Sequence, residues 1–281
     1  MAILIVRQDH KIEEWRQALL TKDSELEVYS YLEPHPKDRI KMAVVWKQPK
    51  GSLMGYDNLQ CIASAGAGVD FIIDDDTIPV NVPVTRIVDQ YLSKDMSEHV
   101  LAVILGLQKN LYDYRVDQFE HKWRPKPYVR ISDSTVGIMG LGELGAKLAK
   151  DLVKFGFTVQ GWSNSKKDIS KVKSSVGQEE LNGFLSTTQI LVCLLPLTNH
   201  TKGILSKELF KLLPKGSFII NLARGGHLVD DDLIDYLNNN HLAGAALDVF
   251  HSEPLPETHP FWRHNKIHMT PHCASVSDSA F

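Results

Sequence analysis

The sequence predicts an α/β protein with two domains, each built around a parallel β-sheet. Short apolar segments alternate with segments of helical periodicity along most of the chain, which is the pattern of repeated βαβ units. The alternation occurs in two series, and one long helical segment separates them. The length agrees with this division, because 281 residues are many for a single core and ordinary for two domains.

The first series predicts a small domain over residues 1–95. Four short apolar segments are its expected strands: AILIV (2–6), LEVYSY (26–31), MAVVW (42–46) and CIASA (61–65). From Ser93 the pattern changes, because apolar residues then recur at helical spacing. This segment is long enough for one long helix or for a helix pair.

The second series predicts a larger domain over residues 96–270. Its expected strands are 135–140, 158–162, 190–195, 217–223, 243–250 and 267–272. These segments are almost continuously apolar, which is typical of a parallel sheet that helices cover on both faces.

Composition and charge exclude several classes of protein. The hydrophobic fraction of 43% and the charged fraction of 23% are those of a soluble globular protein, and a formal net charge of −3 gives no electrostatic basis for binding nucleic acid. The opening MAILIV lacks the basic and longer apolar regions of a secretory signal, and no apolar run approaches the ~18 residues of a membrane span. We therefore expect a cytoplasmic protein without a membrane or nucleic-acid partner. Its cysteines, Cys61, Cys193 and Cys273, are expected to be reduced and mostly buried.

A glycine-rich turn follows the first strand of the second series. Gly140, Gly142 and Gly145 come directly after TVGIM and begin a helical pattern that ends at Gly156. In a dinucleotide-binding turn, the first glycine permits the tight turn, the second lets the backbone approach the pyrophosphate, and the third allows close helix packing. We expect this turn to bind a dinucleotide through Gly140, Leu141, Gly142, Glu143, Leu144 and Gly145. A glycine-rich turn without a ligand is the alternative.

The next strand ends without the acidic residue that usually holds the ribose of NAD. Trp162, Ser163, Asn164 and Lys166 stand there instead, about 20 residues after the glycines. A carboxylate would repel a 2′-phosphate, whereas hydroxyl, amide and ammonium groups can each donate a hydrogen bond to phosphate oxygens. The segment predicts NADPH as the cofactor, with NADH as a weaker alternative. The other interpretation is a solvated basic turn.

Three polar residues follow later strands of the second domain. Arg224 comes after FIINLA, Glu253 after ALDVF and His272 after IHMTP. Because ligands of open α/β sheets bind outside the carboxyl ends of the strands, these residues are candidates for the chemistry. Each alone is weak evidence, since surface arginines, turn glutamates and structural histidines are common.

The sequence resembles a known family through GLGELG, NLARGG, LDVFHSEPLP and TPH, which occur in this order. Over essentially the whole chain it is similar to the D-2-hydroxyacid dehydrogenases. The segments RIVDQYLSKDMSEHVLAVIL, GWSNSKK, FWRHNKIHMTPH and AVVW most resemble its NADPH-preferring glyoxylate/hydroxypyruvate reductases of the A type. The resemblance implies two Rossmann-like domains, a flavodoxin-like substrate domain and a doubly wound dinucleotide-binding domain. It also implies reduction of a small 2-keto acid to the D-2-hydroxy acid.

The resemblance further implies a role for each candidate residue. Arg224 would bind the substrate carboxylate and keto oxygen, His272 would donate the proton, and Glu253 would pair with His272. Hydride addition creates negative charge on the oxygen, which an imidazolium and a guanidinium neutralise, so the residue types agree with these roles. A carboxylate beside the histidine favours its charged form.

Further contacts are expected, some with the substrate and some with the cofactor. In ASAGAGVD, the resemblance implies that Ala67 and Gly68 supply backbone donors for the substrate carboxylate, with Trp46 near the pocket. Further cofactor contacts are expected at Leu195, Pro196, Leu197, Ala223 and Asp248. The alternative for Asp248 is a structural cap at the end of its strand. The alternative for LLPLT (194–198) is a loop with a structural role only.

The helical segment at residues 97–126, with Trp123 near its end, resembles the dimerisation arm of the family. We therefore expect a homodimer, with an intrachain packing helix as the alternative. The chain stops at Phe281, where relatives continue with a helix that returns to the first domain. Residues 271–281 are expected to begin that return segment.

Several other functions stay open. An NAD-dependent relative such as a phosphoglycerate dehydrogenase is disfavoured because SAGAGVD has no basic cluster for a substrate phosphate. Formate dehydrogenases carry Gln where this chain has Glu253, and an inactive paralogue is disfavoured by the intact Arg, Glu and His. A dinucleotide-sensing corepressor or scaffold of the same fold would bind the cofactor with little turnover. The preferred acid among glyoxylate, hydroxypyruvate and bulkier 2-keto acids also stays open.

Overall fold

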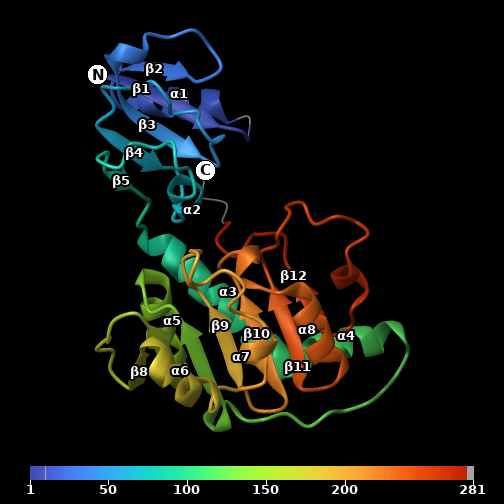
Figure 1. Ribbon diagram of the computed structural model, residues 1–281. Helices are drawn as coiled ribbons and strands as arrows, with labels where there is room; N and C mark the ends of the chain where they lie inside the picture. The colour runs from blue at the N-terminus through green and yellow to red at the C-terminus, as the bar shows by residue number, and fades with distance from the viewer. Residues whose placement is uncertain (10, 277–281) are drawn as a thin grey trace. The chain divides into compact units, whose positions relative to one another are not determined.

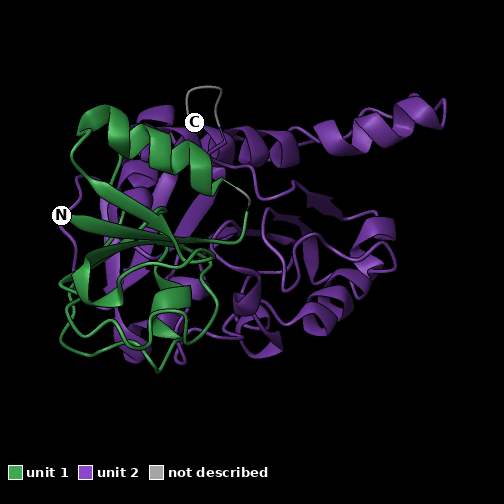
Figure 2. Cartoon of the chain, turned by 90° about the horizontal axis from the view of Figure 1, so that it is seen from above, with its two compact units in different colours: residues 1–89 green, residues 90–281 purple. Residues whose placement is uncertain are grey.

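The computed structural model describes residues 1–9 and 11–276. The chain divides into two compact units, residues 1–89 and residues 90–281 (Figure 2). The division falls just before Gln90, where the long helix of the second unit begins. The assignment of the two units to substrate and cofactor stays a prediction. The expected return segment 271–281 is described only as far as residue 276.

The first unit contains one parallel sheet with the strand order β2-β1-β3-β4-β5. This is the flavodoxin-like order, so the predicted fold class is confirmed. The strands are β1 (Ala2–Arg7), β2 (Glu27–Ser30), β3 (Ile40–Trp46), β4 (Cys61–Ser64) and β5 (Val84–Thr85), and the helices are α1 (Ile12–Lys22), α2 (Asp70–Ile73) and the 3-10 turn η1 (Lys37–Arg39). Every residue of β1 is buried, because this strand lies inside the sheet between β2 and β3.

The second unit contains a seven-stranded parallel sheet with the order β12-β11-β10-β9-β6-β7-β8. Six of these strands form the doubly wound order of dinucleotide-binding domains, and β12 extends one edge. The strands are β6 (Thr135–Met139), β7 (Thr158–Ser163), β8 (Val172–Val176), β9 (Ile190–Cys193), β10 (Ser217–Asn221), β11 (Leu242–Leu247) and β12 (Ile267–Met269). The order reverses between β6 and β9, which is where such sheets bind their ligands.

Helices cover both faces of this second sheet (Figure 1). On one face, α3 (Gln90–Gln108) and α5 (Glu143–Phe155) pack together and share a core with Ile138, Val192 and Ile220 of the strands. On the other face, the core contains residues of α6 (Gly177–Leu185), α7 (Lys207–Phe210) and α8 (Asp230–Asn238). Short 3-10 turns complete the unit: η2 (Ile131–Asp133), η3 (Gly225–His227) and η4 (Pro260–Arg263).

The expected long helical segment is a helix pair. Helix α3 ends at Gln108, and Asn110 takes a left-handed conformation with φ 56° before α4 (Leu111–Phe119) begins. Figure 1 shows α4 extending from the side of the second unit, and the segment after it is tied back by ion pairs from Arg124 to Asp117 and from Lys126 to Asp113. Several apolar side chains of this region are exposed: Leu111, Val116, Phe119, Trp123, Tyr128 and Val129.

Two further sequence expectations can be compared with the structure. In the described part of the chain, no helix combines the length and the apolar character that crossing a membrane requires. The three cysteines are free thiols, but only Cys193 is buried, and Cys61 and Cys273 are half-buried. Burial raises the pKa of the Cys193 thiol to about 12, so this residue belongs to the core.

Candidate active site

The glycine-rich turn lies at the switch point of the second sheet. Gly140 has φ 102°, and a Cβ atom at this position would lie 2.7 Å from the carbonyl oxygen of Leu194. A Cβ atom at Gly145 would lie 1.9 Å from the carbonyl oxygen of Gly140, so helix α5 packs against the turn itself. Only glycine fits these two positions without moving the backbone.

The middle glycine of the turn faces open space. Gly142 precedes α5, and a Cβ atom there would meet nothing within 4 Å. The first backbone N–H groups of α5 have no intrahelical partner and carry the positive end of the helix dipole. A turn that is closely packed at its first and third glycines and open at its second fits the pyrophosphate of a dinucleotide. Leu141 is buried against Gly161, whereas Glu143 is exposed and Leu144 is half-buried.

The end of β7 presents neutral and basic groups. Ser163 is 8% exposed, and its hydroxyl donates a 2.8 Å hydrogen bond to the carbonyl oxygen of Ser165. Asn164, Lys166 and Lys167 follow it on the surface, and no carboxylate occurs before Asp168. These groups can donate hydrogen bonds to the oxygens of a 2′-phosphate, whereas a carboxylate at this position would bind ribose hydroxyls and repel the phosphate.

The indole of Trp162 belongs to the core rather than to the turn. Its side chain is 7% exposed, and Nε1 donates a 2.8 Å hydrogen bond to the carbonyl oxygen of Gly177. The backbone carbonyl of Trp162 accepts the N–H of Gly140 at 2.8 Å. Trp162 therefore shapes the glycine turn through its backbone.

The loop after β9 continues the same edge of the sheet. Leu195 is nearly buried, Pro196 is exposed, and the carbonyl oxygen of Pro196 accepts a 2.7 Å hydrogen bond from the hydroxyl of Thr201. Leu197 is half-buried and faces Gly226, where a Cβ atom would lie 3.0 Å from its side chain. The loop is therefore held by a hydrogen bond within it and by packing against the segment after β10.

His272 and Glu253 are hydrogen-bonded to each other, as the resemblance implied, and their roles in the chemistry stay a prediction. His272 Nδ1 lies 2.8 Å from Glu253 Oε2, and the side chains are 38% and 24% exposed. The second carboxylate oxygen, Oε1, accepts a 3.1 Å hydrogen bond from the N–H of Phe250. The carboxylate is thus fixed by its own loop, and it fixes the orientation of the imidazole. Because Nδ1 is engaged, Nε2 is the nitrogen that remains for a substrate.

Arg224 follows the neighbouring strand β10 and is half-buried. Its Nη1 donates a 2.7 Å hydrogen bond to the carbonyl oxygen of Ala223, and its own carbonyl oxygen accepts Nδ2 of Asn221 at 2.9 Å. A Cβ atom at Gly225 would lie 2.0 Å from the carbonyl carbon of Phe250. Gly225 therefore lets the loop of Arg224 pass directly against the loop that carries Glu253.

Asp248 ends β11 and is 3% exposed. Its carboxylate accepts hydrogen bonds from the hydroxyl of Thr270 and from the backbone N–H groups of Cys273 and Ala274. The structure thus shows the structural cap that was one of the two expectations for this residue. Contact with a nicotinamide stays a prediction.

The candidate residues of the first unit lie together within that unit. Trp46 ends β3, and its ring covers Gly66, where a Cβ atom would lie 2.0 Å from the ring. The hydroxyl of Ser64 donates a 2.8 Å hydrogen bond to the carbonyl oxygen of Gly68, so the loop with Ala67 and Gly68 is ordered by its own contacts. Their contact with a substrate stays a prediction.

A cavity of about 510 Å³ lies beside the ion pair. Its lining consists of Phe250, Glu253, Pro254, Leu255, Trp262, Met269, Thr270, Pro271 and His272. Most of these side chains are apolar, so the ion pair faces a space that offers few competing polar groups.

Sequence reasoning missed two residues that organise the site. Asn221 is fully buried, accepts the N–H of Ala223 at 3.2 Å and donates to the carbonyl oxygen of Arg224, so it shapes the arginine turn. Thr270 connects the histidine loop to Asp248. A polar residue that ends an apolar strand is the signal that identifies Asn221.

Comparison with known proteins agrees with this geometry. Residues 101–274 match the family model described as D-isomer specific 2-hydroxyacid dehydrogenase, NAD binding domain. The chain belongs to this family. It is 38% identical to glyoxylate/hydroxypyruvate reductase A of Serratia proteamaculans over 99% of this chain and 90% of that protein. It is 41% identical to glyoxylate/hydroxypyruvate reductase A of Yersinia enterocolitica over 84% of this chain and 77% of that protein.

Solved structures of this D-2-hydroxyacid dehydrogenase family have the same fold. A D-isomer specific 2-hydroxyacid dehydrogenase of Xanthobacter autotrophicus, in complex with NADPH and MES, has a TM-score of 0.91 and 34% identity, covering 98% of this chain and 89% of that one. The NADPH-dependent glyoxylate/hydroxypyruvate reductase of Sinorhizobium meliloti, in complex with NADP and sulfate, has a TM-score of 0.89 and 36% identity, covering 99% and 90%.

The family membership establishes the general activity. The protein is an NAD(P)-dependent oxidoreductase of the D-2-hydroxyacid dehydrogenase family, as the sequence predicts. The relatives crystallised with NADPH or NADP agree with the expected cofactor.

Proposed function

We propose that the protein uses NADPH to reduce a small 2-keto acid, glyoxylate or hydroxypyruvate, to the corresponding D-2-hydroxy acid. The observation that carries this proposal is the 2.8 Å pair of His272 Nδ1 and Glu253 Oε2, next to a strand end that presents Arg224. A fixed imidazole with one nitrogen available and a nearby guanidinium match a keto acid, which has one oxygen to protonate and one carboxylate to bind. The names of the similar reductases support the substrate class.

In the proposed reaction, bound NADPH supplies a hydride to the keto carbon. Arg224 holds the substrate carboxylate and neutralises charge on the keto oxygen, because its planar fork of donors remains protonated. His272 gives its Nε2 proton to that oxygen, and Glu253 stabilises the imidazolium before transfer. The apolar side chains beside the pair offer few polar groups that would compete for the substrate.

The preference for NADPH is part of the proposal and rests on the end of β7. Ser163, Asn164 and Lys166 offer donors, and the segment contains no carboxylate that would repel a 2′-phosphate. A homodimer is also part of the proposal and rests on the exposed apolar side chains after residue 110.

The decisive measurement is the change in absorbance at 340 nm with NADPH or NADH and a panel of 2-keto acids. We expect glyoxylate or hydroxypyruvate to be reduced, with a higher kcat/KM for NADPH than for NADH. Faster turnover with NADH would contradict the cofactor assignment. Cofactor binding without turnover of any acid would favour a dinucleotide sensor of the same fold.

Replacement of the proton donor tests the assignment of His272. His272→Ala is expected to lower kcat by about 10²- to 10⁴-fold, the usual contribution of a positioned general acid. NADPH binding, followed by fluorescence titration, is expected to stay within about threefold of the original protein, because the mutation changes no residue of the glycine turn. A variant that keeps full turnover would show that another group donates the proton.

A further inference from the structure

We propose that Asp230 is a positioning residue for Glu253, because its carboxylate holds the loop that carries this glutamate on both sides. The inference rests on the proposed function, in which Glu253 orients His272 for proton transfer. Asp230 is the first residue of α8, and it acts on the glutamate through two histidines of the loop.

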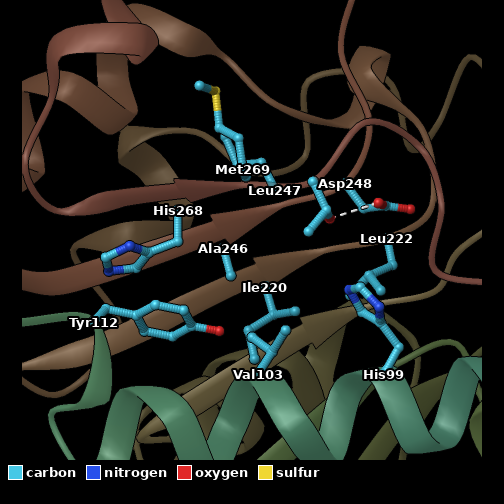
Figure 3. Close-up of a pocket in the computed structure, with 11 residues that line it drawn as sticks. His99, Val103, Tyr112, Ile220, Leu222, Ala246, Leu247, Asp248, His268 and Met269 are labelled. Atoms are coloured by element: carbon cyan, nitrogen blue, oxygen red, sulfur yellow. Dashed lines mark hydrogen bonds between the residues drawn. The ribbon is translucent and has the colours of Figure 1, made fainter. Parts of the chain in front are cut away.

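The glutamate loop, residues 248–259, joins β11 to the turn η4 and contains no helix or strand. Its first residue, Asp248, is bonded to the hydroxyl of Thr270 at 2.6 Å, which Figure 3 shows as a dashed line. The carboxylate of Glu253 is itself bonded within the loop, 3.1 Å from the backbone nitrogen of Phe250. Because the glutamate moves with its loop, its position depends on what fixes the rest of the loop.

The carboxylate of Asp230 contacts one histidine with each oxygen. Oδ1 lies 3.4 Å from Nε2 of His251, and Oδ2 lies 3.3 Å from Nε2 of His259. His251 lies two residues before Glu253, and His259 is the last residue of the glutamate loop. One side chain of α8 therefore contacts the loop both before and after the glutamate.

The other contacts of the two imidazoles show that each Nε2 carries a hydrogen. Nε2 of His251 lies 3.0 Å from the carbonyl oxygen of Leu228, which can only accept a hydrogen bond. Nδ1 of His259 accepts the backbone N–H of Phe261 at 3.4 Å, so the hydrogen of the neutral ring is on Nε2. Both histidines therefore present a donor to Asp230 when they are neutral.

A carboxylate suits the position of Asp230 better than an amide does. Its side chain is 24% exposed and lies at the helix N-terminus, where the helix dipole favours negative charge. Burial raises the pKa of Asp230, whereas the charges of His251 and His259 oppose this shift. An amide has a single acceptor oxygen, so one of the two histidine N–H groups would face the amide hydrogens.

Further contacts hold the glutamate loop against the segment between β10 and α8, which carries Arg224. A Cβ atom at Gly225 would lie 2.4 Å from the backbone nitrogen of His251, and the ring of His251 contacts the carbonyl oxygen of Leu228. These contacts do not involve the side chain of Asp230. Loss of its charge should therefore loosen the loop without releasing it.

The first experiment replaces Asp230 by asparagine and uses the 2-keto acid that the original protein reduces fastest. We expect kcat of Asp230→Asn to fall about tenfold, less than the roughly 100-fold that a 1 Å misplacement can cost, because other contacts still hold the loop. The KM for the keto acid and the Kd for NADPH are expected to stay within about threefold. Asp231→Asn removes the same charge from an exposed neighbour in the same helical turn, and this matched control should leave all three quantities unchanged.

A double variant shows whether Asp230 acts through Glu253. In Glu253→Ala the carboxylate is absent, so the position of the loop no longer affects His272 through it. Adding Asp230→Asn to Glu253→Ala should lower the residual kcat by less than about twofold. A further loss of about tenfold would show that Asp230 acts elsewhere and would overturn the proposal.

His251 provides a second test that does not depend on the folding of Asp230→Asn, since its side chain is 51% exposed. The amide of glutamine can place an N–H donor close to the position of Nε2, whereas leucine has no donor. We expect His251→Leu to lower kcat about fivefold with KM kept, and His251→Gln to retain at least half of the original kcat. Equal kcat values for these two variants would contradict the role of the histidine as a donor.

The failure of this inference differs from a failure of the proposed function. If the original protein reduces no 2-keto acid, or if Glu253→Ala keeps full turnover, the proposed function or its assignment of Glu253 is wrong. If Glu253→Ala loses turnover while folded Asp230→Asn and His251→Leu keep it, only the positioning role is wrong. Thermal unfolding of each variant shows whether it is folded under the assay conditions.

Discussion

Ser163 ends β7 with its hydroxyl bonded to the carbonyl of Ser165, and it stands where related sheets often carry a carboxylate. The side chain is nearly buried and neutral, while Asn164 and Lys166 beside it are exposed. A negative group at this position would lie close to any 2′-phosphate that those donors bind. We therefore expect the cofactor preference to depend on which charge the end of β7 carries.

We predict that Ser163→Asp lowers the ratio of kcat/KM for NADPH to kcat/KM for NADH by at least about tenfold. The new carboxylate repels a 2′-phosphate and accepts hydrogen bonds from ribose hydroxyls, and tenfold corresponds to about 1.4 kcal/mol. Steady-state kinetics with both cofactors measure the ratio. Ser170→Asp adds the same charge at an exposed position of the same loop and is expected to change the ratio little. Equal ratios in Ser163→Asp and the original protein would show that this segment is only a surface turn.

At the scale of elements, the glycines of the turn differ in their surroundings: one is closely packed against the backbone and another is open to a ligand. Gly145 is in close contact with the backbone of Gly140, whereas Gly142 faces open space. The same change at these two neighbouring positions should therefore have different consequences.

We predict that Gly145→Ala destabilises the fold by about 2 kcal/mol, because its Cβ atom forces α5 away from β6. Gly142→Ala is the matched control for stability, since its Cβ atom meets no protein atom, and its melting temperature is expected to stay within about 2 °C. Its Kd for NADPH is expected to rise about tenfold because the methyl group occupies the space proposed for the pyrophosphate. Thermal unfolding and fluorescence titration measure the two effects. Equal melting temperatures for both variants would contradict the packing argument.

The elements that the sequence predicted are those with a strong apolar pattern. The ten expected strands all occur, because each is an apolar run of the kind that a covered parallel sheet requires. The structure adds β5, which has two exposed residues, and β8, whose sequence VKSSV is largely polar. Both are edge strands, where one side of the strand packs little and the apolar pattern is weak.

The sequence predicted which residue types form the site and one of their contacts, but not the other contacts that hold them. Glu253 and His272 could be paired from motifs, and the structure brings them within 2.8 Å. The core position of the Trp162 indole and the bonds of Asp248 were not predictable, because they depend on neighbours that are distant in sequence. Hydrogen bonds of this kind follow from the packing of adjacent strand ends, which a local sequence pattern does not specify.

At the scale of the whole molecule, the helix pair leaves apolar surface on the second unit. Phe119 and Trp123 are 70% and 97% exposed, and the segment around them is held in shape by the ion pair between Arg124 and Asp117. Ordered and exposed aromatic side chains are typical of a surface that another chain covers.

We predict that the protein is a homodimer in solution and that the surface around α4 forms the interface. Light scattering at micromolar concentration is expected to give twice the mass of the chain. Phe119→Lys is expected to shift the equilibrium toward monomer, because a charge at an apolar interface costs several kcal/mol when it is unpaired. Leu32→Lys, at a residue 72% exposed in the first unit, is the matched control and should leave the mass unchanged. A monomeric original protein would contradict the prediction.

The order of strands in the second sheet separates the residues proposed to select the cofactor from those proposed to act on the substrate. The groups proposed to select the cofactor follow β7, on one wing of the sheet, while Arg224, Glu253 and His272 follow β10, β11 and β12 on the opposite wing. From this separation we expect that substitutions around residue 163 change the coenzyme preference without displacing the residues proposed for proton transfer.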